Sequence, residues 1–184
     1  MKNTKTRNLV LCAMCAAITC ILAPISIPIG PVPISLCTFA VMLAGVLLGA
    51  KFGFISQLIY VLLGAVGVPV FAGYSAGLSC IAGMTGGYIV AYPVLALLTG
   101  LLYWKFGKNQ KGKLRIAWML IAMIVGTVVL YAFGTAWFCA VSGTGLVAAL
   151  GMCVVPFLPG DALKMIVVAL ISLPIEKAIA KITE

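Results

Sequence analysis

Long apolar runs, separated by glycine, proline and charged residues, alternate along nearly the whole chain. These runs have the composition of membrane-spanning helices, although several are shorter than the roughly 20 residues of a full crossing. The pattern predicts an all-α integral membrane protein with six transmembrane helices in a single membrane-embedded domain, residues 1–184. The predicted spans are about 8–24, 36–50, 53–67, 84–104, 115–139 and 161–181.

Composition supports a membrane protein over a soluble one. Hydrophobic residues make up 64% of the chain and charged residues 8%, and the mean hydropathy is +1.26. A soluble domain would be about one quarter charged.

The first apolar run lacks the small-residue motif at which signal peptides are cleaved, so we expect it to remain in the protein as the first helix. The apolar stretch 144–158 is interrupted by prolines, and we expect an irregular, partly helical connection there.

The basic residues indicate how the spans are oriented. The chain has 12 Lys and Arg residues and a net charge of +9, and its basic residues cluster at the ends of apolar runs. Such clusters mark cytoplasmic ends of spans, which argues against nucleic-acid binding. With six spans, both termini are expected in the cytoplasm of a multi-pass cell-membrane protein. Lys164 is then the one basic residue at the outer side.

Asp161 and Lys164 are the most informative residues. The other two acids, Glu176 and Glu184, lie near the C-terminal end, where Glu176 is expected to be solvated, so Asp161 is the only acid within the apolar body. Lys164 follows one helical turn later on a similar face. Ionisable residues inside a membrane are costly and usually functional. Two structural alternatives remain, in which Asp161 caps a helix after Gly160 and Lys164 reaches out to the interface.

Three outer segments converge on this pair in the predicted topology, and the third of them is 140–160. Segment 24–33 has four prolines, and we expect a stiff, extended lid without a regular sheet ladder. Segment 67–88 is rich in glycine and carries Phe71, Tyr74 and Tyr88, which offer flat faces to a ligand or form an interfacial aromatic belt. Within it, the Thr85-Gly86-Gly87 backbone begins a helix, either as an anion-binding end or as an ordinary turn.

Other residue patterns exclude several functions. The seven cysteines are scattered through apolar segments and no histidine is present, so we expect no metal site and no cofactor. A single acid in the apolar body provides no catalytic dyad, so an enzyme is not expected. The small residues of Ala13-x-x-x-Ala17 make one face of the first helix smooth. The helix that meets this face could belong to this chain or to another subunit.

Four segments in this order resemble the BioY family. They are the proline-rich loop 24–33, Gly67-Val-Pro-Val-Phe-Ala72, Gly83-Met-Thr-Gly-Gly-Tyr88 and Pro159-Gly-Asp-Ala-Leu-Lys164. The family commonly has proline at the position of Met84, which changes the stiffness of that loop. BioY proteins are the biotin-binding S components of energy-coupling-factor (ECF) vitamin transporters. The resemblance covers essentially the whole chain.

This resemblance implies a binding site near the outer face. Asp161 would accept from the ureido N–H groups of biotin, and Lys164 would pair with the valerate carboxylate. Tyr88 and the backbone of Thr85, Gly86 and Gly87 would contribute to the pocket. The remaining two expected site residues, which would pack near the bicyclic rings, are Phe71 and Tyr74.

The resemblance also implies partner subunits. The Ala13 and Ala17 surface would meet the transmembrane coupling (T) subunit, and separate cytoplasmic ATPases would hydrolyse ATP, since this chain has no Walker-type loop. The alternatives are an S component for another vitamin, a solitary biotin carrier and a purely structural assembly subunit.

Overall fold

The computed structural model of the chain describes residues 4–28 and 31–181, and helices make up most of this part. Lys2 and Glu184, together with the side chain of Lys181, lie outside the described residues. The helices are α1 (Thr4–Leu22), α2 (Cys37–Ala65), α3 (Leu78–Ala82), α4 (Gly86–Leu102), α5 (Gly112–Ser142), α6 (Leu146–Cys153) and α7 (Leu158–Lys181). Two short strands and two short helical turns are β1 (Ser26–Ile27), β2 (Ile34–Ser35), η1 (Ala72–Tyr74) and η2 (Tyr103–Gly107).

By length and composition, four helices of the described part qualify as membrane spans. These are α1, α2, α4 with its continuation η2, and α5. The pair α6 and α7, bent by 48° at the break between them, makes a fifth candidate. The expected connection at 144–158 is confirmed as partly helical, because α6 occupies its first half and a turn leads from there into α7. The all-α fold class is therefore confirmed, with one small strand pair added.

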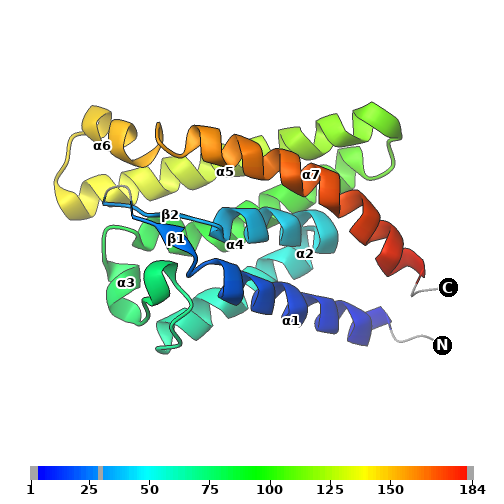
Figure 1. Ribbon diagram of the computed structural model, residues 1–184, viewed down its shortest axis with the longest axis horizontal. Coiled ribbons are helices and arrows are strands. Elements are labelled where there is room, and N and C mark those ends of the chain that lie inside the picture. Colours follow the sequence, from blue (N-terminus) through cyan, green and yellow to red (C-terminus); the bar gives the residue numbers. More distant parts are fainter. Residues whose placement is uncertain (1–3, 29–30, 182–184) are drawn as a thin grey trace.

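Helix α2 doubles back on itself at Gly49. This glycine has φ 75° and ψ −176°, which is far from helical. A Cβ placed at Gly53 would lie 3.2 Å from the Cα of Gly45, whereas residues eight apart in one straight helix are separated by about 12 Å. The two arms run in opposite directions (Figure 1). The predicted segments 36–50 and 53–67 are thus the two arms of a helical hairpin that turns at Gly49.

The proline-rich loop forms a short antiparallel strand pair, contrary to expectation. Ser26 pairs with Ser35 and Ile27 with Ile34. None of the four paired residues is a proline, so each has a backbone N–H, and the prolines of the segment flank the paired positions. Prolines therefore limit this ladder to two pairs without preventing it. Figure 1 shows this hairpin at one end of the molecule, with both termini at the other.

Helix α4 lies at the centre of the bundle, between α2 and α5. Glycines allow close approach at both contacts. A Cβ on Gly100 would lie 2.4 Å from the carbonyl carbon of Gly49, and one on Gly134 would lie 2.3 Å from the ring of Tyr88. Small residues at such contacts let helix backbones pack closely in a membrane. At Gly100, a larger side chain would take the space that the α2 turn occupies. At Gly134, it would take the space of the Tyr88 ring.

We expect Gly100→Ala to lower the thermal unfolding temperature of the detergent-solubilised protein. The added methyl group would press on backbone atoms at the α2 turn, and overpacking of this kind costs about 1–3 kcal/mol. Gly151→Ala is the matched control, because a Cβ there meets nothing within 4 Å. The control should be unchanged or slightly more stable. Equal unfolding temperatures for the two variants would contradict the close contact between α4 and the α2 turn.

Candidate functional site

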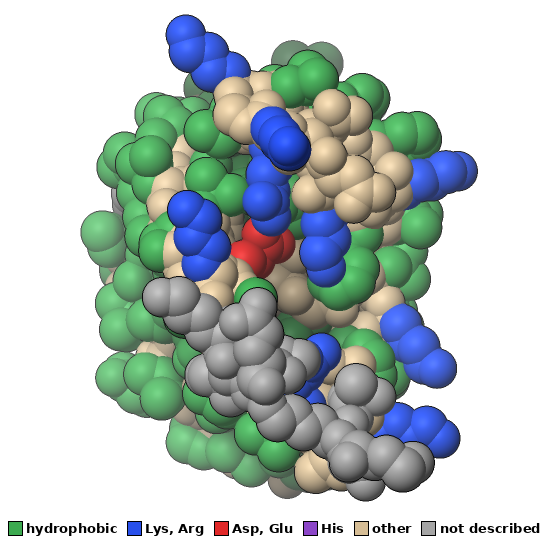
Figure 2. Space-filling model, turned by 90° about the vertical axis from the view of Figure 1, so that its right-hand side faces the viewer, with side chains coloured by type: hydrophobic (Ala, Val, Ile, Leu, Met, Phe, Trp, Pro, Cys, Tyr) green, Lys and Arg blue, Asp and Glu red, His purple; other side chains and the backbone are tan. Residues whose placement is uncertain are grey.

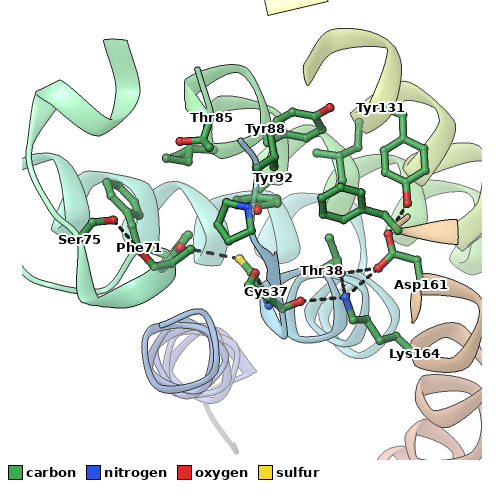
Figure 3. A pocket seen from close by; sticks show the side chains of 18 residues that line it. Cys37, Thr38, Phe71, Ser75, Thr85, Tyr88, Tyr92, Tyr131, Asp161 and Lys164 are labelled. Atoms are coloured by element: carbon green, nitrogen blue, oxygen red, sulfur yellow. Dashed lines mark hydrogen bonds and ion pairs between the residues drawn. The ribbon is translucent and has the colours of Figure 1, made fainter. Parts of the chain in front are cut away.

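A cavity of about 240 Å³ lies at the end of the bundle that carries the strand pair. Its walls come from the β1–β2 hairpin, both arms of α2, the loop 66–77, α4, α5 and the start of α7. Figure 3 shows these side chains pointing toward one space. Segments far apart in the sequence therefore meet here. Five of the expected site residues line the cavity, namely Asp161, Lys164, Tyr88, Thr85 and Phe71.

Asp161 is 3% exposed and accepts three hydrogen bonds. Thr38 Oγ1 donates to Oδ1 at 3.0 Å, Lys164 Nζ to the same oxygen at 2.8 Å, and Tyr131 OH to Oδ2 at 2.5 Å. An ionised carboxylate has about four acceptor positions. One of these positions is therefore left for a donor on a ligand.

The N-cap reading of Asp161 is wrong. Helix α7 begins at Leu158, three residues earlier, and the Asp161 amide already donates to the carbonyl of Phe157 at 2.8 Å. Pro159 is tolerated in this first turn, because the amides there have no partner within the helix. The Asp161 side chain is therefore directed to α2 and α5 rather than to its own helix end.

Lys164 turns inward and does not extend to the membrane interface, so the second structural alternative is also wrong. Its ammonium donates to Ser35 O at 2.8 Å, to Thr38 Oγ1 at 3.0 Å and to Asp161 Oδ1 at 2.8 Å. These bonds use all three donors of the group. We expected Asp161 and Lys164 to meet opposite ends of a ligand, but the two groups contact each other on one side of the cavity.

Aromatic side chains form much of the remaining wall. Tyr60 packs edge-on against Phe71, with ring centroids 5.7 Å apart, and lies 6.3 Å from Tyr92. Phe71 fits closely against α2, because a Cβ on Gly64 would lie 2.1 Å from its ring. The Cys37 thiol contacts Tyr60 OH at 3.7 Å. The cavity therefore combines one charged side with a wall of aromatic rings set at angles to one another, which suits a small molecule with polar and apolar parts.

Tyr88 presents its ring to the cavity, while its hydroxyl is held elsewhere. That hydroxyl lies 3.2 Å from Thr135 Oγ1 and donates to the carbonyl of Cys153 at 3.4 Å. The two partners are on α5 and α6. Tyr88 thus links α4 to the helices that close this end of the bundle. Thr85 lines the cavity at the beginning of α4.

Gly86, Gly87 and Tyr74 do not line the cavity, contrary to expectation. A Cβ on Gly86 would lie 1.7 Å from Ile81 O, and one on Gly87 would lie 2.3 Å from Trp137. The Gly86 amide already donates to Gly83 O at 3.1 Å. These glycines serve close packing. Tyr74 is 70% exposed and lies on the surface at η1.

Sequence reasoning missed several residues that complete the site. Thr38 and Tyr131 bond directly to the ion pair, and Ser35 contributes a backbone carbonyl. Tyr60 and Tyr92 belong to the aromatic wall. A usable signal was present, because hydroxyl groups inside apolar helices need partners. That signal does not specify which partner each hydroxyl finds.

Two further expectations concern other surfaces. Ala13 and Ala17 are exposed on α1, while the neighbouring Ala16 is buried. Glu176 was expected to be solvated, and this expectation is wrong. It is ion-paired with Arg115 and accepts a hydrogen bond from Tyr103 OH at 3.2 Å.

The chain matches one family model and several known proteins over most of its length. The model, described as the BioY family, matches residues 1–181. A protein of Pyrococcus horikoshii named "Probable biotin transporter BioY" is 41% identical over 160 residues, which are 87% of this chain and 90% of that protein. One of Rhizobium etli named "Biotin transporter BioY" is 42% identical over 171 residues, covering 90% of this chain and 91% of that protein.

Solved structures agree with these matches. One is described as the "Crystal structure at 2.1 A of the S-component for biotin from an ECF-type ABC transporter". Its TM-score is 0.86 at 32% identity, covering 96% of this chain and 94% of that one. A second, described as "Structure and mechanism of the S component of a bacterial ECF transporter", has a TM-score of 0.62 at 19% identity, covering 98% of this chain and 99% of that one, and supports the fold alone.

We expect Lys164→Met to destabilise the ligand-free protein by about 3–5 kcal/mol, because it leaves the buried Asp161 carboxylate without its counter-ion. Asp161→Asn combined with Lys164→Met removes both charges. It keeps an acceptor for one of the two hydroxyls of Thr38 and Tyr131, which bond to different carboxylate oxygens, and the amide NH2 can donate to the other hydroxyl. The double variant should therefore unfold at a higher temperature than Lys164→Met alone. Thermal unfolding in detergent measures both. A double variant less stable than the single one would contradict a coupled ion pair.

Proposed function

The chain belongs to the BioY family, and on that premise we propose that it is the substrate-binding S component of an ECF-type biotin transporter. The main observation that supports this proposal is the fold shared with the S component for biotin, at a TM-score of 0.86 over 96% of this chain. The buried charged pair in a cavity supports a ligand-binding role beyond the fold.

The size of the cavity favours a small vitamin. Pockets for drug-sized ligands are roughly 300–1,000 Å³, and this one, at about 240 Å³, lies just below that range. Tyr60, Phe71 and Tyr92 supply aromatic rings at differing angles, against which the bicyclic ring of biotin could pack. The polar groups lie mainly on one side, where they would fix the orientation of the ligand.

The geometry of the charged pair favours contact with the ureido end of biotin. A urea group offers N–H donors and a carbonyl acceptor side by side. Asp161 has about one acceptor position left for an N–H. Lys164, in contact with it at 2.8 Å, could exchange one of its three present acceptors for the ureido carbonyl. One compact ligand group would then satisfy both charged residues.

The expected pairing of Lys164 with the valerate carboxylate is not supported by this arrangement. That carboxylate lies at the other end of biotin from the urea, whereas Lys164 and Asp161 are adjacent. Across the cavity from them, the hydroxyl-bearing residues are Ser75 and Thr85 (Figure 3). We assign the valerate end to that side, where the Thr85 hydroxyl can donate to a carboxylate. The Ser75 hydroxyl already donates to the carbonyl of Ala72 at 2.8 Å and would have to exchange that partner.

The same proposal covers topology and partners. The two arms of α2 would each cross the membrane, giving six spans in one membrane-embedded domain with both termini in the cytoplasm, in line with the distribution of basic residues. Ala13 and Ala17 would contact the coupling subunit, and separate ATPases would supply the energy. Two alternatives are an S component for another vitamin and a solitary biotin carrier. The binding experiment below tests the first alternative, and an uptake assay tests the second.

We expect the purified chain to bind biotin without nucleotide, and Lys164→Ala to weaken biotin and biotin amide by the same factor. Loss of a charge-assisted hydrogen bond corresponds to about tenfold or more in affinity. Asp161→Asn should weaken both ligands as well. Titration calorimetry of each variant with both ligands measures the two factors.

Lys177→Ala is the matched control, because it removes an exposed lysine from the other end of α7. It should leave both affinities unchanged. A loss confined to biotin in Lys164→Ala would instead assign that residue to the carboxylate. No binding of biotin, with stabilisation by a different vitamin, would overturn the substrate assignment.

We expect Ala13→Trp combined with Ala17→Trp to abolish biotin uptake by the assembled transporter while leaving biotin binding by the isolated chain unchanged. Bulky side chains would prevent close approach of a partner helix to α1. Val128→Trp, at an exposed position on α5, is the control and should retain uptake. Normal uptake by the α1 variant in reconstituted vesicles would remove this face from the partner interface. Uptake by the chain alone in vesicles would favour the solitary carrier.

A further inference from the structure

A second cavity opens at the opposite end of the bundle, where both termini lie. Its volume is about 730 Å³, and its walls come from the first turns of α1, the turn region of α2, the end of η2, the start of α5 and the last turns of α7. Figure 2 looks onto this end and shows acidic atoms recessed in a hollow with basic side chains on several sides. This cavity shares no described lining residue with the proposed biotin site.

The charges around this cavity are strongly unbalanced. In the part of the chain that the structure describes, four basic side chains line it, namely Arg7, Lys108, Arg115 and Lys177, together with one acid, Glu176. Glu176 is committed to its ion pair with Arg115 and to Tyr103, and Arg115 Nε also donates to Tyr103 OH at 2.8 Å. Among the described residues, Lys108 and Lys177 form no ion pair. Lys108 and Lys177 are therefore two positive charges at this cavity without an ion-pair partner among the described carboxylates.

The environment of Lys108 reflects this imbalance. Its ammonium lies 2.9 Å from the centroid of the Trp104 ring, at the mouth of the cavity. Burial lowers the pKa of Lys108, Glu176 opposes that shift, and Arg115 and Arg7 add to it. A partly buried ammonium among other cations is stabilised by an anion placed beside it. The cavity thus favours an anionic group close to Lys108.

Apolar side chains make up part of the cavity wall, beside the recessed Glu176–Arg115 pair. They include Leu11, Leu47, Phe52 and Leu173. Trp104 anchors one wall, because its indole N–H donates to the carbonyl of Val46 at 2.9 Å. A wall that combines basic side chains with apolar ones matches a molecule that carries a phosphate at one end and hydrocarbon at the other. Basic pockets between membrane helices on the side of positive loops bind anionic lipid headgroups.

We propose that this cavity is a binding site for an anionic phospholipid of the leaflet next to the termini. The phosphate of the headgroup would lie between Lys108 and Lys177, and the acyl chains would run along the leucine and phenylalanine walls. A free phosphate ester would share the charge contacts but not the apolar ones. An acidic protein segment could also contact the lysines, but it has no acyl chains to lie along the apolar walls. The site thus differs from general attraction of a basic surface to a membrane by requiring both the pair of lysines and the lipid tails.

The test compares lipid binding to the detergent-purified chain and to three double variants, two of which carry glutamines and have equal charge, while the third carries arginines and keeps the charge of the original chain. Native mass spectrometry with phosphatidylglycerol and phosphatidylcholine measures the preference for the anionic lipid. Lys108→Gln with Lys177→Gln should lower that preference on the order of tenfold, from the contribution of two lysines near a lipid phosphate. Lys51→Gln with Lys113→Gln, at exposed positions that do not line the cavity, should retain it. Lys108→Arg with Lys177→Arg should also retain it.

Three results would overturn the proposal. Equal loss in the two glutamine variants would indicate general electrostatic attraction. An unchanged preference in the Lys108 and Lys177 glutamine variant would remove the cavity from lipid binding. Competition by glycerol phosphate at the same concentration as the lipid would indicate a site for a free anion. Unchanged thermal unfolding of all variants in detergent without added lipid verifies that each is folded.

Discussion

The buried ion pair between Asp161 and Lys164 is the interaction on which the rest of this end of the structure depends. An unpaired charge in such apolar surroundings would be strongly destabilising, so the pair has to be surrounded by donors and acceptors. Thr38, Tyr131 and Ser35 provide them from α2, α5 and β2. One pair of charges thereby joins α7 to three other elements. The cavity lies where these elements meet, so the interaction that stabilises the fold also shapes the candidate site.

Close helix packing brings those partners within reach. The turn of α2 at Gly49 positions both of its arms beside α4, and Gly100 lets α4 approach the turn. Gly134 leaves room for the ring of Tyr88 between α4 and α5. Side chains larger than glycine would separate these helices. The hydroxyl and carboxylate groups of the site would then lie too far apart for hydrogen bonds of 2.5–3.0 Å. At Gly100 and Gly134, glycine therefore serves the close approach of neighbouring helices, whereas at Gly49 it also allows the positive φ of the turn.

The two ends of the molecule differ in how their charges are balanced. At the hairpin end, one acid and one base neutralise each other, which suits a site that receives a small polar group of no net charge. At the end with the termini, several basic residues surround a single acid that is already paired with Arg115. Water and lipid phosphates can balance an excess of positive charge there, whereas the apolar interior cannot. In the two proposals, the same residue types would serve recognition at one end and contact with lipid at the other.

The sequence alone determined the membrane class, the positions of most helices and the importance of Asp161 and Lys164, because apolar length and isolated charges are local properties that a linear pattern records. It also located Phe71, Thr85 and Tyr88, which line the cavity. Only the tertiary structure decided that Gly86, Gly87 and Tyr74 lie outside it, that Thr38 and Tyr131 complete the ion-pair network, and that Glu176 is paired with Arg115. Which side chains meet depends on where each helix turns and how closely neighbouring backbones approach, and these distances between remote residues are not encoded in any one segment.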